Sequence, residues 1–437
     1  MIGLIVLFIG FIIVSCDSVD NLPDEYLVPT ISITTTSGDF PEDKETYLDV
    51  TVTSKRSDDD ETFNGISGRI KLRGNSTLNY DKKAFKLKFD DKQHFLGLGA
   101  GPSRDFVLLA EYADLSMMRN TIAYGLARDI MRQSFVTDTM YVDLMFNGEH
   151  LGLYVLAEQT EVDDVRIDLD TSGEDDPIIT DTGYLLELEA DHRRRTSEGL
   201  HMTDYFHVPG YTDEDLLLDH TNFSEYLHSF EPAWYVIKSD TKSEAQVMFI
   251  QNVMKDLYDA VYQDGTEISV GNHLDLQSAV DMYVFQLVVG DNDANYSSMY
   301  LYKDKGGKVV IGPPWDHDLS FGNNSYYDGV TDHYMFHLLD KLADYAWFKE
   351  MVITRYDALV SIKPFDDRLM DLIDQNVDTY GSLIRADRLL WNGTREEGGW
   401  HLYNKEGIDD WTLSVRYLEE WIEGRMVWVD GVIDNMR

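Results

Sequence analysis

The sequence predicts an α+β protein with two lobes, the first rich in β-strands and the second mainly helical. Between residues 28 and 195, short runs of β-branched or alternating residues are bounded by Gly, Pro and Asp. From residue 244 onward, apolar residues recur with helical spacing. A β-rich segment followed by a helical one favours two lobes with a cleft between them. We therefore expect a β-rich lobe at 28–195 and a mainly helical lobe at 196–437.

The first lobe contains strands and one substantial helix. Strands are expected where β-branched residues cluster or where polar and apolar residues alternate, at 31–36, 47–52, 69–73, 83–89 and 183–189. Apolar residues spaced by four predict a helix over 114–133. The pair Asn147 and Gly148 predicts a hairpin between strands at 141–146 and 151–157.

The second lobe is expected to be helical around one short hairpin. Helical periodicity predicts helices over 244–263 and 273–289, and again through most of 332–436. Between these helices, two short strands at 298–303 and 308–311 flank a pair of glycines. Residues 313–322 then form a structured loop.

Composition excludes several classes of protein. The 437 residues contain 37 Lys and Arg against 79 Asp and Glu, which gives a formal net charge of −42. Phosphates would be repelled by such a chain, so we expect no nucleic-acid partner. The single cysteine excludes an intramolecular disulfide framework and a Cys-rich zinc module.

The N-terminal sequence is typical of a targeting segment. Residues 2–14 are almost purely apolar, too short a run to span a bilayer and typical of a signal peptide. The run ends just before Cys16, the only cysteine, in a pattern similar to the bacterial lipobox. We expect a lipoprotein signal peptide at 1–16, a tether at 17–27, and export to the bacterial cell envelope, on its periplasmic or surface side. The membrane would then be reached only through a lipid on Cys16.

A basic window interrupts this acidic chain. Eight Lys and Arg lie between Arg69 and Lys92, against three Asp. The window suits an anionic ligand, although a solvated strand face would have the same composition. Strand alternation puts Lys83 on the apolar face with Phe85 and Leu87, and puts Lys82, Lys86 and Lys88 on the other face.

Two acidic loops form a second group of candidate site residues. One carries Asp291, Asp293 and Asn295, and the other carries Asp316 and Asp318. Their oxygens are ligands that Mg²⁺ prefers, although ordinary surface turns would also explain them. His317 is expected to be structural or exposed rather than a ligand.

The basic strand and the acidic loops together indicate phosphoryl transfer, in which a cation holds phosphates and carboxylates bind metal and accept a proton. The chain has no glycine-rich G-x-G-x-x-G and no P-loop, so neither an ordinary protein kinase nor a P-loop enzyme fits. Paired carboxylates also permit glycoside hydrolysis, which stays open as an alternative.

Seven blocks of the chain resemble the spore-coat protein H (CotH) kinase family. They occur in family order, at 71–77, 82–88, 115–127, 151–159, 183–189, 291–302 and 314–322. The resemblance implies a two-lobed, atypical protein-kinase-like fold. It also implies transfer of the γ-phosphate of ATP to Ser hydroxyls of a protein substrate, with Mg²⁺ or Mn²⁺.

The resemblance also implies the roles of individual residues. The catalytic aspartate resembles Asp293. The metal-binding aspartate resembles Asp316, with Asp318 as a further ligand. Ser298 stands where the family often has Asn, and Asn295 is the candidate to replace that metal ligand.

The nucleotide-binding lysine resembles Lys83, with Arg73 and Lys86 as secondary phosphate contacts. Either Glu158 or Glu187 would orient that lysine. Two alternatives stay open because a fold does not fix a reaction. One is a non-catalytic surface lipoprotein, a pseudokinase that binds or assembles partners. The other is a kinase-like enzyme that transfers AMP.

Overall fold

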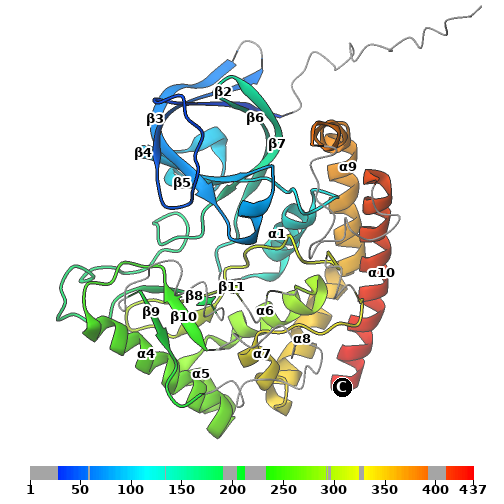
Figure 1. Ribbon diagram of the computed structural model, residues 1–437. Helices are drawn as coiled ribbons and strands as arrows, with labels where there is room; N and C mark the ends of the chain where they lie inside the picture. Colours follow the sequence, from blue (N-terminus) through cyan, green and yellow to red (C-terminus); the bar gives the residue numbers. More distant parts are fainter. Residues whose placement is uncertain are drawn as a thin grey trace, which may run out of the picture.

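The computed structural model describes residues 28–57, 60–132, 134–189, 204–211, 233–291, 293, 297–323, 329–391 and 410–437. The protein is a mixture of helices and strands, as the sequence predicts. A closed barrel of seven strands lies next to a second body, made of a five-stranded sheet and most of the helices (Figure 1).

The barrel is closed by one parallel pair among antiparallel ones. Its strands follow the order β1-β2-β3-β4-β5-β7-β6, and β1 pairs with β6 in parallel. Their bounds are β1 Thr30–Thr35, β2 Leu48–Ser57, β3 Asp60–Arg73, β4 Ala84–Gln93, β5 Ser103–Leu109, β6 Thr139–Phe146 and β7 Glu149–Glu158. Two short 3₁₀ turns, Ser76–Asn79 and Phe95–Gly97, flank β4. The strands and the Asn147-Gly148 hairpin expected in this region are confirmed, apart from details at their ends.

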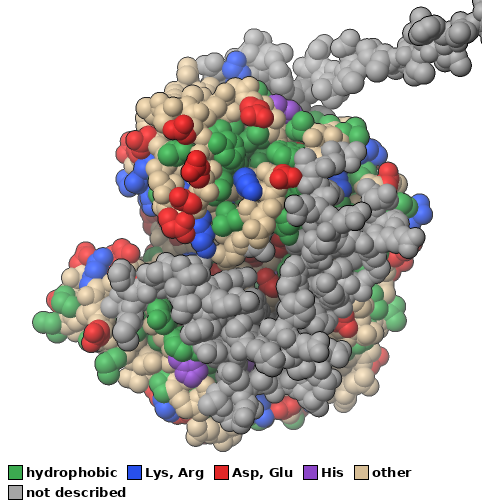
Figure 2. All heavy atoms as spheres, viewed as in Figure 1, with side chains coloured by type: hydrophobic (Ala, Val, Ile, Leu, Met, Phe, Trp, Pro, Cys, Tyr) green, Lys and Arg blue, Asp and Glu red, His purple; other side chains and the backbone are tan. Residues whose placement is uncertain are grey.

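Strand alternation fills the barrel with apolar side chains and places cations outside. Leu72 pairs with Phe85, and Ile70 pairs with Leu87. These four side chains are buried in the barrel core. The intervening pair is Lys71 with Lys86, which therefore projects from the outer face. Over the barrel, basic and acidic side chains are interspersed on the face shown in Figure 2.

The second sheet runs in the order β12-β11-β8-β10-β9, with every pair antiparallel. Its bounds are β8 Tyr184–Glu189, β9 Tyr205–His207, β10 Trp234–Ile237, β11 Ser297–Lys303 and β12 Val309–Ile311. The predicted hairpin near residues 298–311 is confirmed as β11 and β12. The strand predicted at 183–189 is β8, and it lies at the centre of this second sheet rather than in the barrel.

The helices pack around one another beside this sheet. They are α1 Arg119–Ile130, α4 Glu244–Asp259, α5 Glu267–His273, α6 Leu276–Val289, α7 His337–Leu342, α8 Ala346–Ile362, α9 Phe365–Leu390 and α10 Trp411–Met436, with a short π-helix at Ala260–Asp264 after α4. Side chains are buried along the whole of α6 except at its first two residues, which makes it the central helix of the large core. In the described part of the chain, none of the helices has the length and apolarity required to cross a bilayer.

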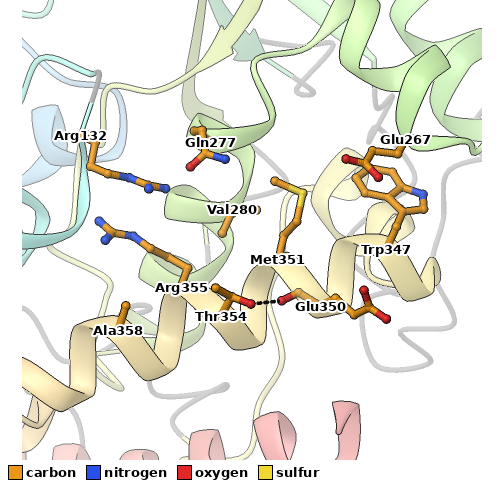
Figure 3. Close-up of a pocket in the computed structure, with 10 residues that line it drawn as sticks. All are labelled: Arg132, Glu267, Gln277, Val280, Trp347, Glu350, Met351, Thr354, Arg355 and Ala358. Atoms are coloured by element: carbon orange, nitrogen blue, oxygen red, sulfur yellow. Dashed lines mark hydrogen bonds between the residues drawn. The ribbon is translucent and has the colours of Figure 1, made fainter.

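A buried carboxylate joins three helical elements. Asp281 on α6 accepts hydrogen bonds from Arg132, just after α1, and from Arg355 on α8 at 2.8 Å. Arg355 also donates to the carbonyl of Ile130, the last residue of α1, at 2.7 Å. Figure 3 shows these two arginines side by side at one end of a surface cavity of about 420 Å³. The arrangement fixes the C-terminal end of α1 against α6 and α8.

The prediction that Lys83 faces the core and Lys82 faces outward is wrong. Strand β4 begins at Ala84, so the alternation of the strand does not extend back to these two lysines. Lys82 is 1% exposed and lies 2.9 Å from both carboxylate oxygens of Asp387 on α9. Lys83 is half-buried, and its ammonium group donates to the carbonyls of Leu78 and Tyr80. Lys82 therefore ties the barrel to the helical body.

Replacement of Asp387 by Ala is expected to destabilise the protein strongly. It would leave the ammonium group of Lys82 buried without its counter-charge, which typically costs about 3–5 kcal/mol. Chemical denaturation would measure the change. The matched control is Asp357→Ala, which removes a carboxylate from the surface pair with Arg437 and should leave the unfolding midpoint unchanged. Equal effects of the two substitutions would contradict the assignment.

Candidate active site

A cavity of about 420 Å³ lies between the barrel and the second sheet. Its walls come from the end of β3, from β4, from the segment after β7, from β8, β10 and β11, and from the loop at 315–319. The cavity brings together most of the site residues predicted from sequence, namely Arg73, Lys86, Glu187, Asp293, Asp316 and Asp318. The first and last of these residues, Arg73 and Asp318, are 245 positions apart in the chain, so only folding makes them neighbours.

The barrel supplies a basic wall. Lys71 and Arg73 lie two residues apart on β3 and so share a face, and Lys86 pairs with Lys71 across the β3–β4 ladder. Burial and the neighbouring charge of Lys86 lower the pKa of Lys71. The guanidinium of Arg73 lies 5.5 Å from the ring centre of Trp315, a residue of the opposite loop. The positive charges of Lys71 and Lys86 are thus held side by side, and a bound anion would relieve their repulsion.

A buried carboxylate sets the position of one of these cations. Lys86 lies 3.0 Å from Asp105, and Lys88 lies 3.1 Å from the second oxygen of the same carboxylate. Burial raises the pKa of Asp105, but its two lysine partners outweigh this effect and the net pKa is lowered. Of the two lysines, Lys86 lines the cavity.

The opposite wall is acidic. Asp293 follows α6, and Asp316 and Asp318 lie on the loop after β12. Burial, together with the negative charges of Asp316, Glu111, Asp293 and Asp291, raises the pKa of Asp318 well above its ordinary value. The carboxylates are close enough to repel one another, and a bound cation would relieve that repulsion.

The backbone around this wall adopts an unusual conformation. Ser298, Asp316 and Phe321 have φ angles of +61°, +64° and +53°, in the left-handed region that non-glycine residues rarely adopt. The register of β11 against β8 also shifts between Ser297 and Tyr300, beside Ser298. The hydroxyl of Ser298 lies 3.5 Å from Asp316 Oδ2. Strained residues of this kind persist where the surrounding contacts hold them, often at functional sites.

Buried polar contacts hold the acidic loop against α1. Arg119 is 1% exposed and ion-paired with Asp114, and its Nε donates to the carbonyl of Ser320 at 3.0 Å. Asp114 also accepts hydrogen bonds from the backbone N–H groups of Met118 and Arg119, at 2.9 and 2.8 Å. The chain before Arg119 therefore folds around a carboxylate, which explains why α1 is shorter than the predicted helix at 114–133.

His317 is buried and contacts both acidic loops. Its ring lies edge-on to Tyr124 and Phe285, and Nδ1 lies 3.2 Å from Ser320 Oγ and 3.4 Å from Asp291 Oδ2. The other oxygen of Asp291 accepts a hydrogen bond from the backbone N–H of Asp293 at 3.0 Å. His317 therefore links the two acidic loops to each other.

Two predicted nucleotide contacts lie elsewhere. Lys83 does not line the cavity, because its ammonium group is turned toward the carbonyls of the preceding turn. Glu158 is 2% exposed and is bonded to Arg166 at 3.3 Å and to the backbone N–H of Asp138 at 3.1 Å. Asn295 and Cys16 lie outside the described residues.

Glu187 lies in the cavity with a cationic partner. Its carboxylate is 2.8 Å from Lys238, which follows β10. Burial and the negative charge of Glu187 raise the pKa of Tyr300, the residue opposite it on β11. Of the two glutamates predicted to orient a lysine, only Glu187 is placed near the cavity, and its partner is Lys238 rather than Lys83.

Sequence reasoning missed several lining residues. Lys71 belongs to the basic window and shares a strand face with Arg73, so its alternation could have indicated it. Lys44, Glu161 and Lys238 carry no such signal, because they come from separate segments that meet only in the folded chain.

The acidic wall offers carboxylate oxygens to a divalent cation. Among the described residues, no three or more His, Cys, Asp or Glu side chains are grouped so that they could hold a metal ion by themselves. Mg²⁺ commonly binds through one or two carboxylates, with water and substrate phosphates completing its shell. The open cavity with Asp316 and Asp318 fits that kind of site. The same donors suit Mn²⁺.

Glu111 is a buried carboxyl behind the acidic wall, and we expect it to make stability depend on pH. Burial and the nearby charge of Asp114 raise its pKa from 4.5 to about 8. A group whose pKa is raised by folding stabilises the folded state below the unfolded pKa, and this contribution is lost as pH rises through the folded pKa. The free energy of unfolding should therefore fall between about pH 4.5 and pH 8 in metal-free buffer.

Glu111→Gln tests this expectation because Gln keeps the acceptor for Asn120, which donates to Glu111 Oε1 at 3.0 Å. Denaturation at pH 5 should give equal stability for the variant and the wild type. At pH 8.5 the variant should be more stable by about 1 kcal/mol or more. The control Glu149→Gln, at an exposed position on β7, should show no such divergence. A constant difference at both pH values would refute the role of Glu111.

One family of known proteins matches most of this chain. Individually curated proteins gave no match to the chain. The family described as CotH kinase protein matches residues 70–429, a span that includes the basic wall, the acidic loops and the helices up to α10. A match over most of the chain shows that this protein belongs to the CotH kinase family.

Proposed function

We propose that the protein is an atypical protein kinase that transfers the γ-phosphate of ATP to Ser hydroxyls, with Mg²⁺ or Mn²⁺. Family membership supports a kinase-like function. The observation that supports metal-dependent phosphoryl transfer from ATP is the separation of charge across one cavity. Cations from the barrel face carboxylates from the second body, as phosphoryl transfer requires.

The basic wall would bind the phosphates. Lys71, Arg73 and Lys86 project from neighbouring strands of a rigid barrel, and they line the cavity together. A guanidinium and two ammonium groups provide several donors for phosphate oxygens, and such charge-assisted hydrogen bonds are the strong ones. In this proposal Lys71 and Lys86 replace Lys83 as the principal lysine contacts.

The acidic wall would hold the metal and the acceptor. Asp316 and Asp318 would hold the cation, with Asn295 as a further proposed ligand. When bound, the cation would neutralise charge that develops on the transferred phosphoryl group. Asp293 would orient the Ser hydroxyl and accept its proton, as the carboxylate general base of a kinase does.

The protein would act outside the cytoplasm. The N-terminal apolar run and Cys16 support a lipoprotein signal peptide and a lipid anchor in the bacterial cell envelope. The net charge of −42 makes nucleic acid an unsuitable partner.

We expect the protein lacking residues 1–16 to transfer ³²P from γ-labelled ATP to a Ser-containing protein in the presence of Mg²⁺ or Mn²⁺. Asp293→Asn should lower kcat by about 10²–10⁴-fold, because the general base is lost. Asp340→Asn, in a pair with His333 remote from the cavity, is the control and should keep full activity. Transfer of label from α-labelled ATP instead would identify an AMP transferase. Nucleotide binding without transfer of either label would identify a pseudokinase.

Lys86 and Lys88 share Asp105 as ion-pair partner, but only Lys86 lines the cavity. Lys86→Met should raise KM for ATP by about tenfold, which corresponds to one charge-assisted contact. Lys88→Met is the matched control, since it removes the same charge from the same ion pair but not from the cavity. Equal increases of KM in the two variants would contradict the phosphate role of Lys86.

A further inference from the structure

The loop that carries Asp316 depends on α1 for the hydrogen bonds of its backbone. The N–H of Asp316 donates to the hydroxyl oxygen of Tyr124 at 3.2 Å. The next N–H, of His317, donates to Asn120 Oδ1 at 2.8 Å. Asn120 and Tyr124 are four residues apart on α1, so they lie on the same face of the helix, one turn apart. Two successive backbone groups at the acidic wall are therefore held by two side chains of one helix.

Both side chains are themselves fixed. Asn120 is 3% exposed, and its amide donates to Glu111 Oε1 at 3.0 Å, which orients its oxygen toward His317. The ring of Tyr124 is fully buried and packs against Trp315 and His317, with ring centres 6.3 and 5.7 Å apart. The acceptors therefore have little freedom to move away from the loop.

The left-handed conformation of Asp316 gives these contacts a specific consequence. A non-glycine residue with φ of +64° is strained, and the surrounding structure has to maintain that conformation. The N–H bond of His317 is buried and that of Asp316 is part-buried, and an N–H that loses its acceptor away from water is costly. Removal of either acceptor therefore favours rearrangement of the loop. The carboxylate of Asp316 would then move relative to Asp293 and Asp318.

We infer that Asn120 and Tyr124 are positioning residues for the proposed metal-binding carboxylate Asp316. The inference rests on the proposed function only in that it takes Asp316 as a metal ligand. Neither residue lines the cavity, and neither would touch ATP or the acceptor Ser. Their effect would be exerted through the backbone of residues 316 and 317.

Tyr124→Phe is the sharpest test because it removes one oxygen and keeps the buried ring. The measurement is the Kd of Mn²⁺, obtained by paramagnetic titration of the protein without residues 1–16. Loss of a partner that orients a metal ligand typically weakens metal binding by about 10–100-fold, and we expect a loss of at least tenfold. Asn120→Ala should weaken Mn²⁺ binding in the same direction.

The matched control is Tyr154→Phe. Tyr154 is also fully buried, and its hydroxyl makes one hydrogen bond to a backbone group, the carbonyl of Lys83 at 2.9 Å, in the barrel. Both Tyr→Phe variants should lower the thermal midpoint to a similar extent in EDTA. Only Tyr124→Phe should change the Kd of Mn²⁺, which separates positioning from general stability.

The outcomes distinguish this inference from the proposed function. An unchanged Kd in Tyr124→Phe, with Mn²⁺ bound by the wild type and lost in Asp316→Asn, would overturn the inference alone. Binding of Mn²⁺ without phosphate transfer by the wild type would overturn the kinase proposal, and the comparison of Kd values would still decide the inference. If Asp316→Asn binds Mn²⁺ as tightly as the wild type, or if the wild type binds none, both the metal role and the inference fail.

Discussion

Charge repulsion within the acidic wall of the cavity sets a demand that the surrounding structure has to meet. Asp293, Asp316 and Asp318 are gathered on one wall of the cavity, with Glu111 buried behind them, although their like charges oppose that placement. The cost has to be offset by contacts elsewhere. Those contacts come from the large core around α6 and from the buried polar face of α1, which holds the loop at 315–321. A site that is unfavourable by itself is thus maintained by a rigid surrounding structure.

The barrel contributes the complementary positive charge through the alternation of side chains along its strands. On β3 and β4, alternation places apolar side chains inside and lysines outside, so a closed, well-packed barrel can present cations at fixed positions. The ion pair of Lys82 with Asp387 then attaches this barrel to the helical body. Because the cavity has one wall from each part, the distance between cations and carboxylates depends on that attachment.

Much of the fold could be predicted from local patterns, and parts of the site could be too. The strand pattern of the barrel and the β11–β12 hairpin follow from alternation and turn residues, which act over a few positions. Motif and charge pattern also indicate Asp293 and Asp316 as candidate site residues. Lys83 lies one residue before the start of β4 and outside its ladder with β3, so strand alternation does not predict where its side chain points. Lys82 carries no local sign of its partner, which lies 305 residues further along the chain.

The sequence alone identifies the chemical groups that this protein can use. It showed a basic strand pair in an acidic chain, two acidic loops and an N-terminal apolar run that ends at Cys16. The folded structure then brings a subset of these groups together. It placed β8 in the second sheet, turned Lys83 away from the cavity, and brought Lys71 to a position opposite Asp316 and Asp318. The reason is physical: alternation and turn signals are local, whereas the pairing of charges and the burial of backbone groups depend on distant segments that become neighbours on folding.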